Sequence, residues 1–133
     1  MTLPRSFLAV LGAAVVAPVA LASGATGRAG GAEMFGLIGK MTAVAGQRDA
    51  LAAILLEGTD SMPGCLSYII AADPDDADAL WITEVWDSRE SHEASLALPA
   101  VQAAIAKGRP LIAGFSDRVE TTPLGGRGLR QRG

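Results

Sequence analysis

The sequence predicts an α+β domain in which helices cover one face of a four-stranded antiparallel sheet. Three observations lead to this prediction. Short apolar segments bounded by Gly and Pro are typical of strands. Two other regions carry apolar residues at the spacing of a helix. These segments follow one another in the order β-α-β-β-α-β, the split βαβ arrangement.

The first strand, the first helix and the second strand occupy the N-terminal half of the predicted domain. Residues 35–44 are mostly apolar and are expected to form a strand that ends before Gly46. From Gln47 onward the apolar residues recur on one side of a helix, which stops at Pro63. Residues 65–72 are again apolar and are expected to form the second strand.

An acidic turn and a second helical region complete the predicted domain. Residues 73–78 suit a hairpin loop before a third strand at residues 80–86. Asp87 and Glu90 resemble a capping box, which places the start of a helix near Ser88. The remaining predicted elements are the rest of this helix to Leu98, a helical piece over residues 100–107 and a last strand over residues 115–121.

This order of elements is that of the ferredoxin-like fold, and it leaves one face of the sheet bare. A bare face suits a homodimer that packs sheet against sheet. About 90 folded residues are also few for the core of a monomer, so dimerisation would add stability.

Both ends of the chain are expected to lie outside the domain. Residues 1–22 resemble an export signal, because Arg5 precedes an apolar run that ends in a small-x-small cleavage pattern. The run is shorter than the about 20 residues that span a bilayer core, so no stable membrane anchor is expected. The other expected parts are a flexible linker at residues 23–33, the domain at residues 34–124 and a disordered Gly/Arg-rich tail at residues 125–133. The protein is then exported, to the periplasm or the medium; if Met34 is the true start, it is cytoplasmic.

Charge and cysteine content narrow the classes of function. The chain has 11 Lys and Arg against 14 Asp and Glu, a formal net charge of −3, and the excess of acids falls in the predicted domain. This disfavours nucleic acid as a partner. Cys65 is the only cysteine, and neither a metal-ligand cluster nor a phosphate-binding glycine loop is recognisable. The sequence therefore predicts no metal and no cofactor.

The third strand carries a carboxylate that needs an explanation. Alternation places Glu84 on the same face as Leu80, Ile82 and Trp86. A carboxylate among apolar side chains is costly unless it is paired or protonated. Lys40 and Arg118 are the candidate partners. Glu84 is therefore either half of a structural ion pair or of a salt bridge at a dimer interface, or it is an acid–base group or hydrogen-bond acceptor for a phenolic substrate.

His92, the only histidine, lies about one turn into the helix that follows. In a semi-apolar cleft, an imidazole can act as a general base at neutral pH or donate a hydrogen bond. If His92 tilts toward the sheet, it meets the end of the third strand near Trp86. The alternative is an exposed surface histidine. Tyr68 and Trp86 could line an aromatic pocket between helices and sheet, and core packing explains both residues equally well.

Four short segments stand out by their order and spacing. They are residues 34–40 (MFGLIGK), 62–68 (MPGCLSY), 84–86 (EVW) with 90–92 (ESH), and 98–101 (LPAV). Together they resemble the antibiotic biosynthesis monooxygenase family, and most closely its branch of quinol monooxygenases. The resemblance covers residues 35–122, nearly all of the predicted domain.

The resemblance implies a ferredoxin-like protomer, a homodimer that forms an αβ barrel, and a pocket between helices and sheet. Relatives oxidise quinols, anthrones or similar electron-rich aromatics with O2, without metal, flavin or haem. Such a protein holds the ring, supplies a base and stabilises the anion that reduces O2. His92 is then the base or proton shuttle, Glu84 a polar orienter and Trp86 a wall for the ring, with Tyr68 in the same pocket.

Haem-degrading relatives share this fold but use a histidine near residues 101–104 and an asparagine on the first strand, and both are absent here. The sequence therefore predicts a small dimer that binds a small aromatic substrate and oxygenates it with O2, without a cofactor. The main alternative is a non-enzymatic αβ-barrel dimer that binds or senses a small hydrophobic aromatic ligand. A third reading is a structural dimer with a filled core.

Overall fold

Four strands and three α-helices make up residues 33–129, the part of the chain that the computed structural model describes. In chain order the elements are β1 (Phe35–Ala43), α2 (Arg48–Gly58), β2 (Cys65–Ala72), β3 (Ala79–Trp86), α3 (Arg89–Ser95), α4 (Pro99–Gly108), the 3₁₀ turn η2 (Arg109–Leu111) and β4 (Ile112–Thr121). This order confirms the predicted ferredoxin-like arrangement, in which α3 and α4 together form the second helical region.

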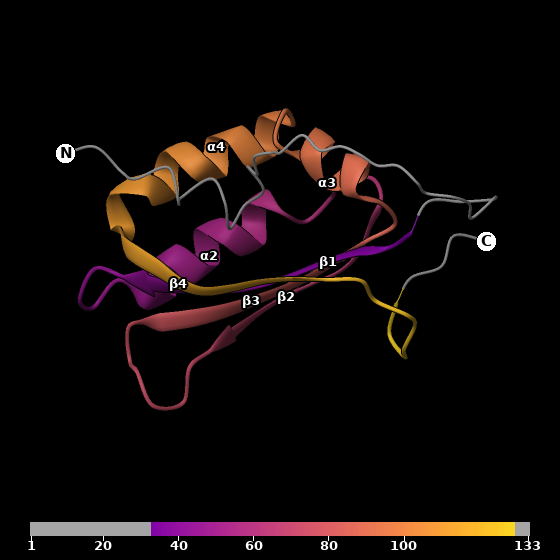
Figure 1. The fold of residues 1–133 in the computed structure, drawn as a ribbon. Helices are drawn as coiled ribbons and strands as arrows, with labels where there is room; N and C mark the ends of the chain where they lie inside the picture. The colour runs from indigo at the N-terminus through magenta and orange to yellow at the C-terminus, as the bar shows by residue number, and fades with distance from the viewer. Residues whose placement is uncertain (1–32, 130–133) are drawn as a thin grey trace.

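The strands form one antiparallel sheet in the order β2-β3-β1-β4. Figure 1 shows α2, α3 and α4 together on one face of this sheet. No helix of the described residues covers the opposite face. The predicted α+β architecture, with helices on one face only, is therefore confirmed.

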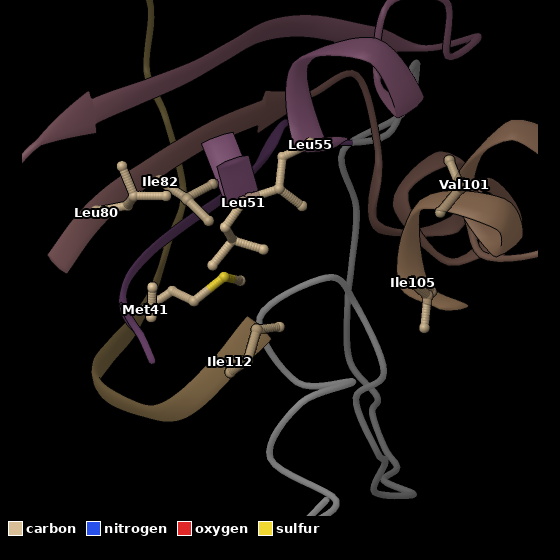
Figure 2. Packing of buried hydrophobic residues seen from close by; sticks show 9 residues of the cluster. Met41, Leu51, Leu55, Leu80, Ile82, Val101, Ile105 and Ile112 are labelled. Atoms are coloured by element: carbon tan, nitrogen blue, oxygen red, sulfur yellow. The ribbon is translucent and has the colours of Figure 1, made fainter. Parts of the chain in front are cut away.

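The main hydrophobic core lies between the sheet and the helices α2 and α4. Its buried members are Met41, Ala43, Leu51, Leu55, Leu80, Ile82, Val101, Ile105 and Ile112, most of which are labelled in Figure 2. Leu51 and Leu55 are one helical turn apart and therefore project from the same side of α2. Burial of each large aliphatic side chain contributes about 1.5–3 kcal/mol. A second, smaller cluster of Phe35, Leu37 and Trp86 lies at the end of the sheet where β1 begins and β3 ends.

The start of α3 differs from the predicted one. Ser88 is the N-cap, and its side-chain oxygen accepts a hydrogen bond from the backbone N–H of Ser91 at 3.1 Å. The predicted capping box of Asp87 and Glu90 is therefore wrong by one residue. Ser88 takes this role because its backbone is extended, while Arg89 is already helical.

The boundaries of the last elements also differ from those predicted. α3 ends at Ser95, before Leu98, which is extended as residues before a proline usually are. Pro99 then takes the first position of α4, where its missing N–H costs no hydrogen bond. β4 begins three residues earlier than predicted, because Ile112 already pairs with Ala43 of β1.

The predictions for the two ends of the chain fall largely outside the described residues. This holds for the export signal at residues 1–22, for residues 23–32 of the linker and for residues 130–133 of the tail. Residues 125–129 contain a turn and neither helix nor strand. Between residues 33 and 129, no helix is both long and apolar enough to cross a membrane.

At Gly58, helix α2 packs closely against α4. A Cβ atom at Gly58 would lie 2.4 Å from Cβ of Ala104 and 3.2 Å from the carbonyl oxygen of Ala100. We expect Gly58→Ala to destabilise the fold by about 1–2 kcal/mol, because the clash outweighs the gain in helix propensity. Urea unfolding of the full chain measures this loss. Gly114→Ala is the matched control, because nothing lies within 4 Å of its Cβ position; equal stability of the two variants would contradict the prediction.

Candidate active site

The pleat of β3 carries a carboxyl group into the interior of the domain. The side chains that point toward the helices are those of Leu80, Ile82, Glu84 and Trp86, and each residue is at most 2% exposed. The residues between them are only partly buried. The alternation predicted for this strand is therefore confirmed.

Glu84 is bonded to a neighbour on its own strand. Its Oε1 accepts a hydrogen bond of 2.9 Å from Nε1 of Trp86. Burial raises the pKa of Glu84 to about 8, although the Trp86 hydrogen bond and the charge of Arg118 both act to lower it. Glu84 therefore keeps its proton at neutral pH.

Lys40, one of the two predicted partners of Glu84, lies on the other face of the sheet. In the register of β1 and β3, Leu37 is opposite Glu84 and Lys40 is opposite Trp81. Nζ of Lys40 lies 3.5 Å from Oδ2 of Asp73 and 5.6 Å from the centre of the Trp81 ring. The predicted pairing with Glu84 is wrong, because Lys40 and Leu37 have opposite parity along β1.

Arg118, the other predicted partner, belongs to a charged network on the helix side of the sheet. Its Nη2 lies 3.0 Å from Oε2 of Glu120, and Nη2 of Arg89 lies 2.9 Å from Oε1 of the same carboxylate. Burial alone would raise the pKa of Glu120, but the hydrogen bonds and charges of both arginines lower it. Glu120 therefore stays ionised and links β4 to the start of α3, while the charge of Arg118 also acts on Glu84.

His92 is buried and its ring lies beside Glu84. The residue is 1% exposed, and its Nε2 lies 3.8 Å from Oε1 of Glu84. Nε2 has no hydrogen-bond partner within residues 33–129. The ring centre lies 4.9 Å from that of Phe35 and 5.4 Å from that of Trp86. The alternative of an exposed surface histidine is therefore wrong.

The surroundings of His92 keep its ring neutral. Burial lowers the pKa of His92 to about 4, and the charges of Arg118 and Arg89 act in the same direction. The negative charge of Glu120 offsets part of this effect. At neutral pH the interior thus holds an unprotonated imidazole beside a protonated carboxyl group.

Tyr68 faces Glu84 across the pairing of β2 with β3. Its hydroxyl is buried and has no hydrogen-bond partner in the described part of the chain. Burial raises the pKa of Tyr68 well above its usual value, and repulsion by Glu84 and Cys65 in their ionised forms adds to this. Tyr68 also lines a cleft of about 590 Å³ between β2 and the segment that follows α2.

Trp86 lies behind this cleft and not in its lining. The residue is 1% exposed and packs with Phe35 and Leu37. Met62 and Cys65 line the cleft and also pack against this cluster. The structure thus brings the predicted residues Glu84, Trp86 and His92 into contact and places Tyr68 on the adjacent strand.

Sequence reasoning missed Phe35 and Arg89 as parts of this region. The guanidinium of Arg89 lies 4.4 Å from the centre of the Phe35 ring, a distance suited to a cation–π contact. Phe35 in turn packs on His92. Phe35 and Leu37 share one face of β1, but Ile38 on the other face is also apolar, so the pattern did not single out Phe35. No local sequence pattern predicts the ion pair of Arg89 with Glu120, because the two residues are 31 positions apart in the chain.

Asp73, in the acidic turn between β2 and β3, forms hydrogen bonds that shape the turn. Between residues 33 and 129, no three His, Cys, Asp or Glu side chains gather closely enough to hold a metal ion. In the turn between β2 and β3, Oδ1 of Asp73 accepts hydrogen bonds from the N–H groups of Asp75 and Asp76. Its Oδ2 accepts a hydrogen bond from Nε1 of Trp81. This carboxylate therefore shapes the hairpin loop, as the sequence predicted for the acidic turn.

Comparison with known proteins identifies one family. The family model described as antibiotic biosynthesis monooxygenase matches residues 34–107. The crystal structure of a candidate antibiotic biosynthesis monooxygenase from Chloroflexus aurantiacus is 68% identical to this chain, with a TM-score of 0.72. The match covers 73% of this chain and 99% of that one. No curated protein matches the chain.

Two further crystal structures share the fold at much lower identity. PA3566 from Pseudomonas aeruginosa is 20% identical with a TM-score of 0.62, over 71% of this chain and 97% of its own. SnoaB from Streptomyces nogalater, a cofactor-independent oxygenase, is 15% identical with a TM-score of 0.60, over 72% of this chain and 98% of its own. At these identities the likeness establishes the fold alone.

Proposed function

Because the chain belongs to the antibiotic biosynthesis monooxygenase family, we propose that it oxidises a quinol, an anthrone or a similar electron-rich aromatic with O2, without a metal or an organic cofactor. SnoaB has the same fold and is a cofactor-independent oxygenase, so the fold is compatible with this chemistry. The observation that supports the proposal most directly is the buried Nε2 of His92. This atom lies 3.8 Å from Oε1 of Glu84 and has no hydrogen-bond partner in the described chain.

In the proposed mechanism His92 is the base. A substrate hydroxyl that donates to Nε2 fills the open hydrogen-bonding position and can transfer its proton there. Ionised Glu84, whose Oε1 lies 3.8 Å from the same Nε2, then stabilises the imidazolium through its negative charge. The indole N–H of Trp86 holds this carboxylate in place. Trp86 is thus a positioning residue.

Loss of the proton leaves an electron-rich aromatic anion. Such an anion gives an electron to O2 more readily than the neutral phenol, so the protein needs only to form the anion and hold it. Arg118 and Arg89 create a positive potential at the site, since their charges lower the pKa of His92. The same potential favours the substrate anion.

We place the aromatic ring of the substrate in the cleft beside Tyr68. The volume of this cleft, about 590 Å³, lies within the range of roughly 300–1,000 Å³ that is usual for small-molecule pockets. Met62 and Cys65 lie between the cleft and the cluster around Trp86, so they must shift when the ring approaches His92. The unbranched, flexible side chain of Met62 suits such a movement.

We also propose that the protein is a homodimer that packs sheet against sheet into an αβ barrel. The support is the sheet face that no described helix covers, where Ile69 and Val119 are 56% and 50% exposed. Ile69 lies on β2 and Val119 on β4, the two edge strands, so a second sheet packed on this face would cover both side chains. A sedimentation mass equal to one protomer at micromolar concentration would contradict this proposal.

Oxygen uptake by the purified full chain tests the proposed function. The substrates are a panel of reduced quinols and anthrones, with a chelator present to remove adventitious metal. A heat-inactivated sample measures autoxidation. We expect saturable uptake above this background for at least one compound.

Uptake no faster than the heat-inactivated control across the whole panel would contradict the oxygenase proposal. Saturable binding of the same compounds without uptake would then favour the alternative of a ligand-binding or sensing αβ-barrel protein. The two functions therefore differ in turnover and not in binding.

A further inference from the structure

Two buried polar atoms within residues 33–129 lack a hydrogen-bond partner, and both belong to side chains around Glu84. They are Oη of Tyr68 and Nε2 of His92. Tyr68 is the cross-strand neighbour of Glu84 on β2, and His92 approaches Glu84 from α3. Beside these side chains, Phe35, Leu37 and Trp86 pack together in an apolar cluster.

An unpaired donor or acceptor in the interior destabilises a fold, so such groups persist where something else requires them. Phenylalanine would fill the space of the Tyr68 ring without leaving a hydroxyl unpaired. The mechanism proposed above uses Nε2 of His92 but assigns nothing to the Tyr68 hydroxyl. This hydroxyl therefore still needs an explanation.

The two atoms offer complementary hydrogen bonds. The high pKa of the Tyr68 hydroxyl keeps it protonated, so it can donate a hydrogen bond. Neutral His92 accepts a hydrogen bond at Nε2 in the tautomer that carries the proton on Nδ1. A ligand that satisfies both must therefore carry one oxygen that donates and a second oxygen that accepts.

We propose that Tyr68 is a specificity-determining residue whose hydroxyl donates a hydrogen bond to a second oxygen of the substrate. The site then selects rings with two oxygens over rings with one. This assignment rests on the proposed function, because it assumes that a substrate hydroxyl binds to His92. It also gives Tyr68 a polar role besides its place in the lining of the cleft.

Anaerobic calorimetry on the full chain tests this assignment. The probes are the three dihydroxybenzenes, ortho, meta and para, with phenol as the reference that has one oxygen. We expect at least one dihydroxybenzene to bind the wild type about fivefold or more tightly than phenol, from one additional buried hydrogen bond. In Tyr68→Phe this preference disappears, while the affinity for phenol is retained.

Two controls separate this role from a purely structural one. Ser67→Ala removes a different hydroxyl group from a residue that lines the cleft, and we expect this variant to keep the preference for a dihydroxybenzene over phenol. Tyr68→Phe should melt at the same temperature as the wild type or higher, because it removes an unpaired buried hydroxyl. A lower melting temperature with an unchanged preference would show that the hydroxyl has a partner inside the protein, and would overturn the assignment.

The remaining outcomes are also decisive. An unchanged preference in Tyr68→Phe, or the failure of all four probes to bind the wild type, overturns the assignment of Tyr68. The binding is measured without O2 and therefore does not depend on turnover. A protein that binds with this preference but takes up no oxygen contradicts the proposed function and leaves the assignment of Tyr68 standing.

Discussion

Replacement of His92 by alanine is expected to lower kcat/KM for oxygen uptake by about 10²-fold to 10⁴-fold, the usual contribution of a positioned general base. The reason is the position of Nε2, which is buried beside Glu84 and has no hydrogen-bond partner in the described chain. Without the imidazole, the substrate proton has no acceptor in the site. Initial rates of oxygen uptake, corrected for autoxidation, measure the loss.

The alanine variant also removes a buried ring between Phe35 and Trp86, so its loss of activity has a second explanation in a weakened fold. His92→Gln separates the two causes, because glutamine fills more of the space and can form hydrogen bonds but is not a base. We expect the same loss of activity in both variants. Glu93→Gln, on the exposed side of the same helix, is the control that should leave the rate unchanged. A His92→Gln protein that is folded and retains a third or more of the wild-type rate would contradict the role of His92.

The burial of Glu84 could be predicted from the sequence, and the burial of His92 could not. On β3, alternation puts Glu84 on the same face as Leu80, Ile82 and Trp86, so the sequence already predicted apolar surroundings for this carboxyl group. His92 lies in α3, which has only seven residues and an N-cap at Ser88. In so short a helix, the spacing of apolar residues does not identify the buried face. The contacts with Phe35 and Trp86 settle it, and they come from other elements.

The partners of Glu84 were harder to predict because they depend on register. Leu37 and Ile38 are adjacent and both apolar, so the sequence of β1 does not show which of its faces meets the helices. In the observed register, Leu37 lies opposite Glu84, and Lys40 lies on the face of the sheet that points away from the helices. The link from Arg89 to Glu120 joins α3 to β4 and likewise depends on the assembled fold. Local pattern therefore predicted the elements, while the pairing of strands decided which charges act on the site.

The pH dependence of the reaction is expected to report the ionisation of Glu84. The competent form has ionised Glu84 beside neutral His92, because only the carboxylate stabilises the imidazolium that forms. Burial raises the pKa of Glu84 to about 8. We therefore expect kcat/KM to rise about tenfold per pH unit below this pKa and to level off above it, a gain of about 10²-fold from pH 6 to the plateau.

Glu84→Gln is the variant that tests this assignment, because glutamine cannot ionise. Its rate should be low and independent of pH between pH 6 and pH 9. If His92 alone set the profile, the rise would lie near its own pKa of about 4, and the wild-type rate would already be flat over this range. That flat profile would sink the assignment. A substrate whose own pKa exceeds 9 keeps its ionisation out of the profile.

The raised pKa of Glu84 also affects the stability of the fold, so stability must be measured over the same pH range. The pKa of Glu84 is higher in the folded protein than in the unfolded chain. Protonated Glu84 therefore makes its full contribution to the free energy of unfolding below about pH 4.5, and this contribution is lost as the pH rises toward 8. The pH range that activates the site is thus the range in which this carboxylate weakens the fold. Circular dichroism should show that the protein remains folded up to pH 9. A rise in rate across a range of constant fold can then be assigned to the ionisation of Glu84, and a rise that accompanies unfolding cannot.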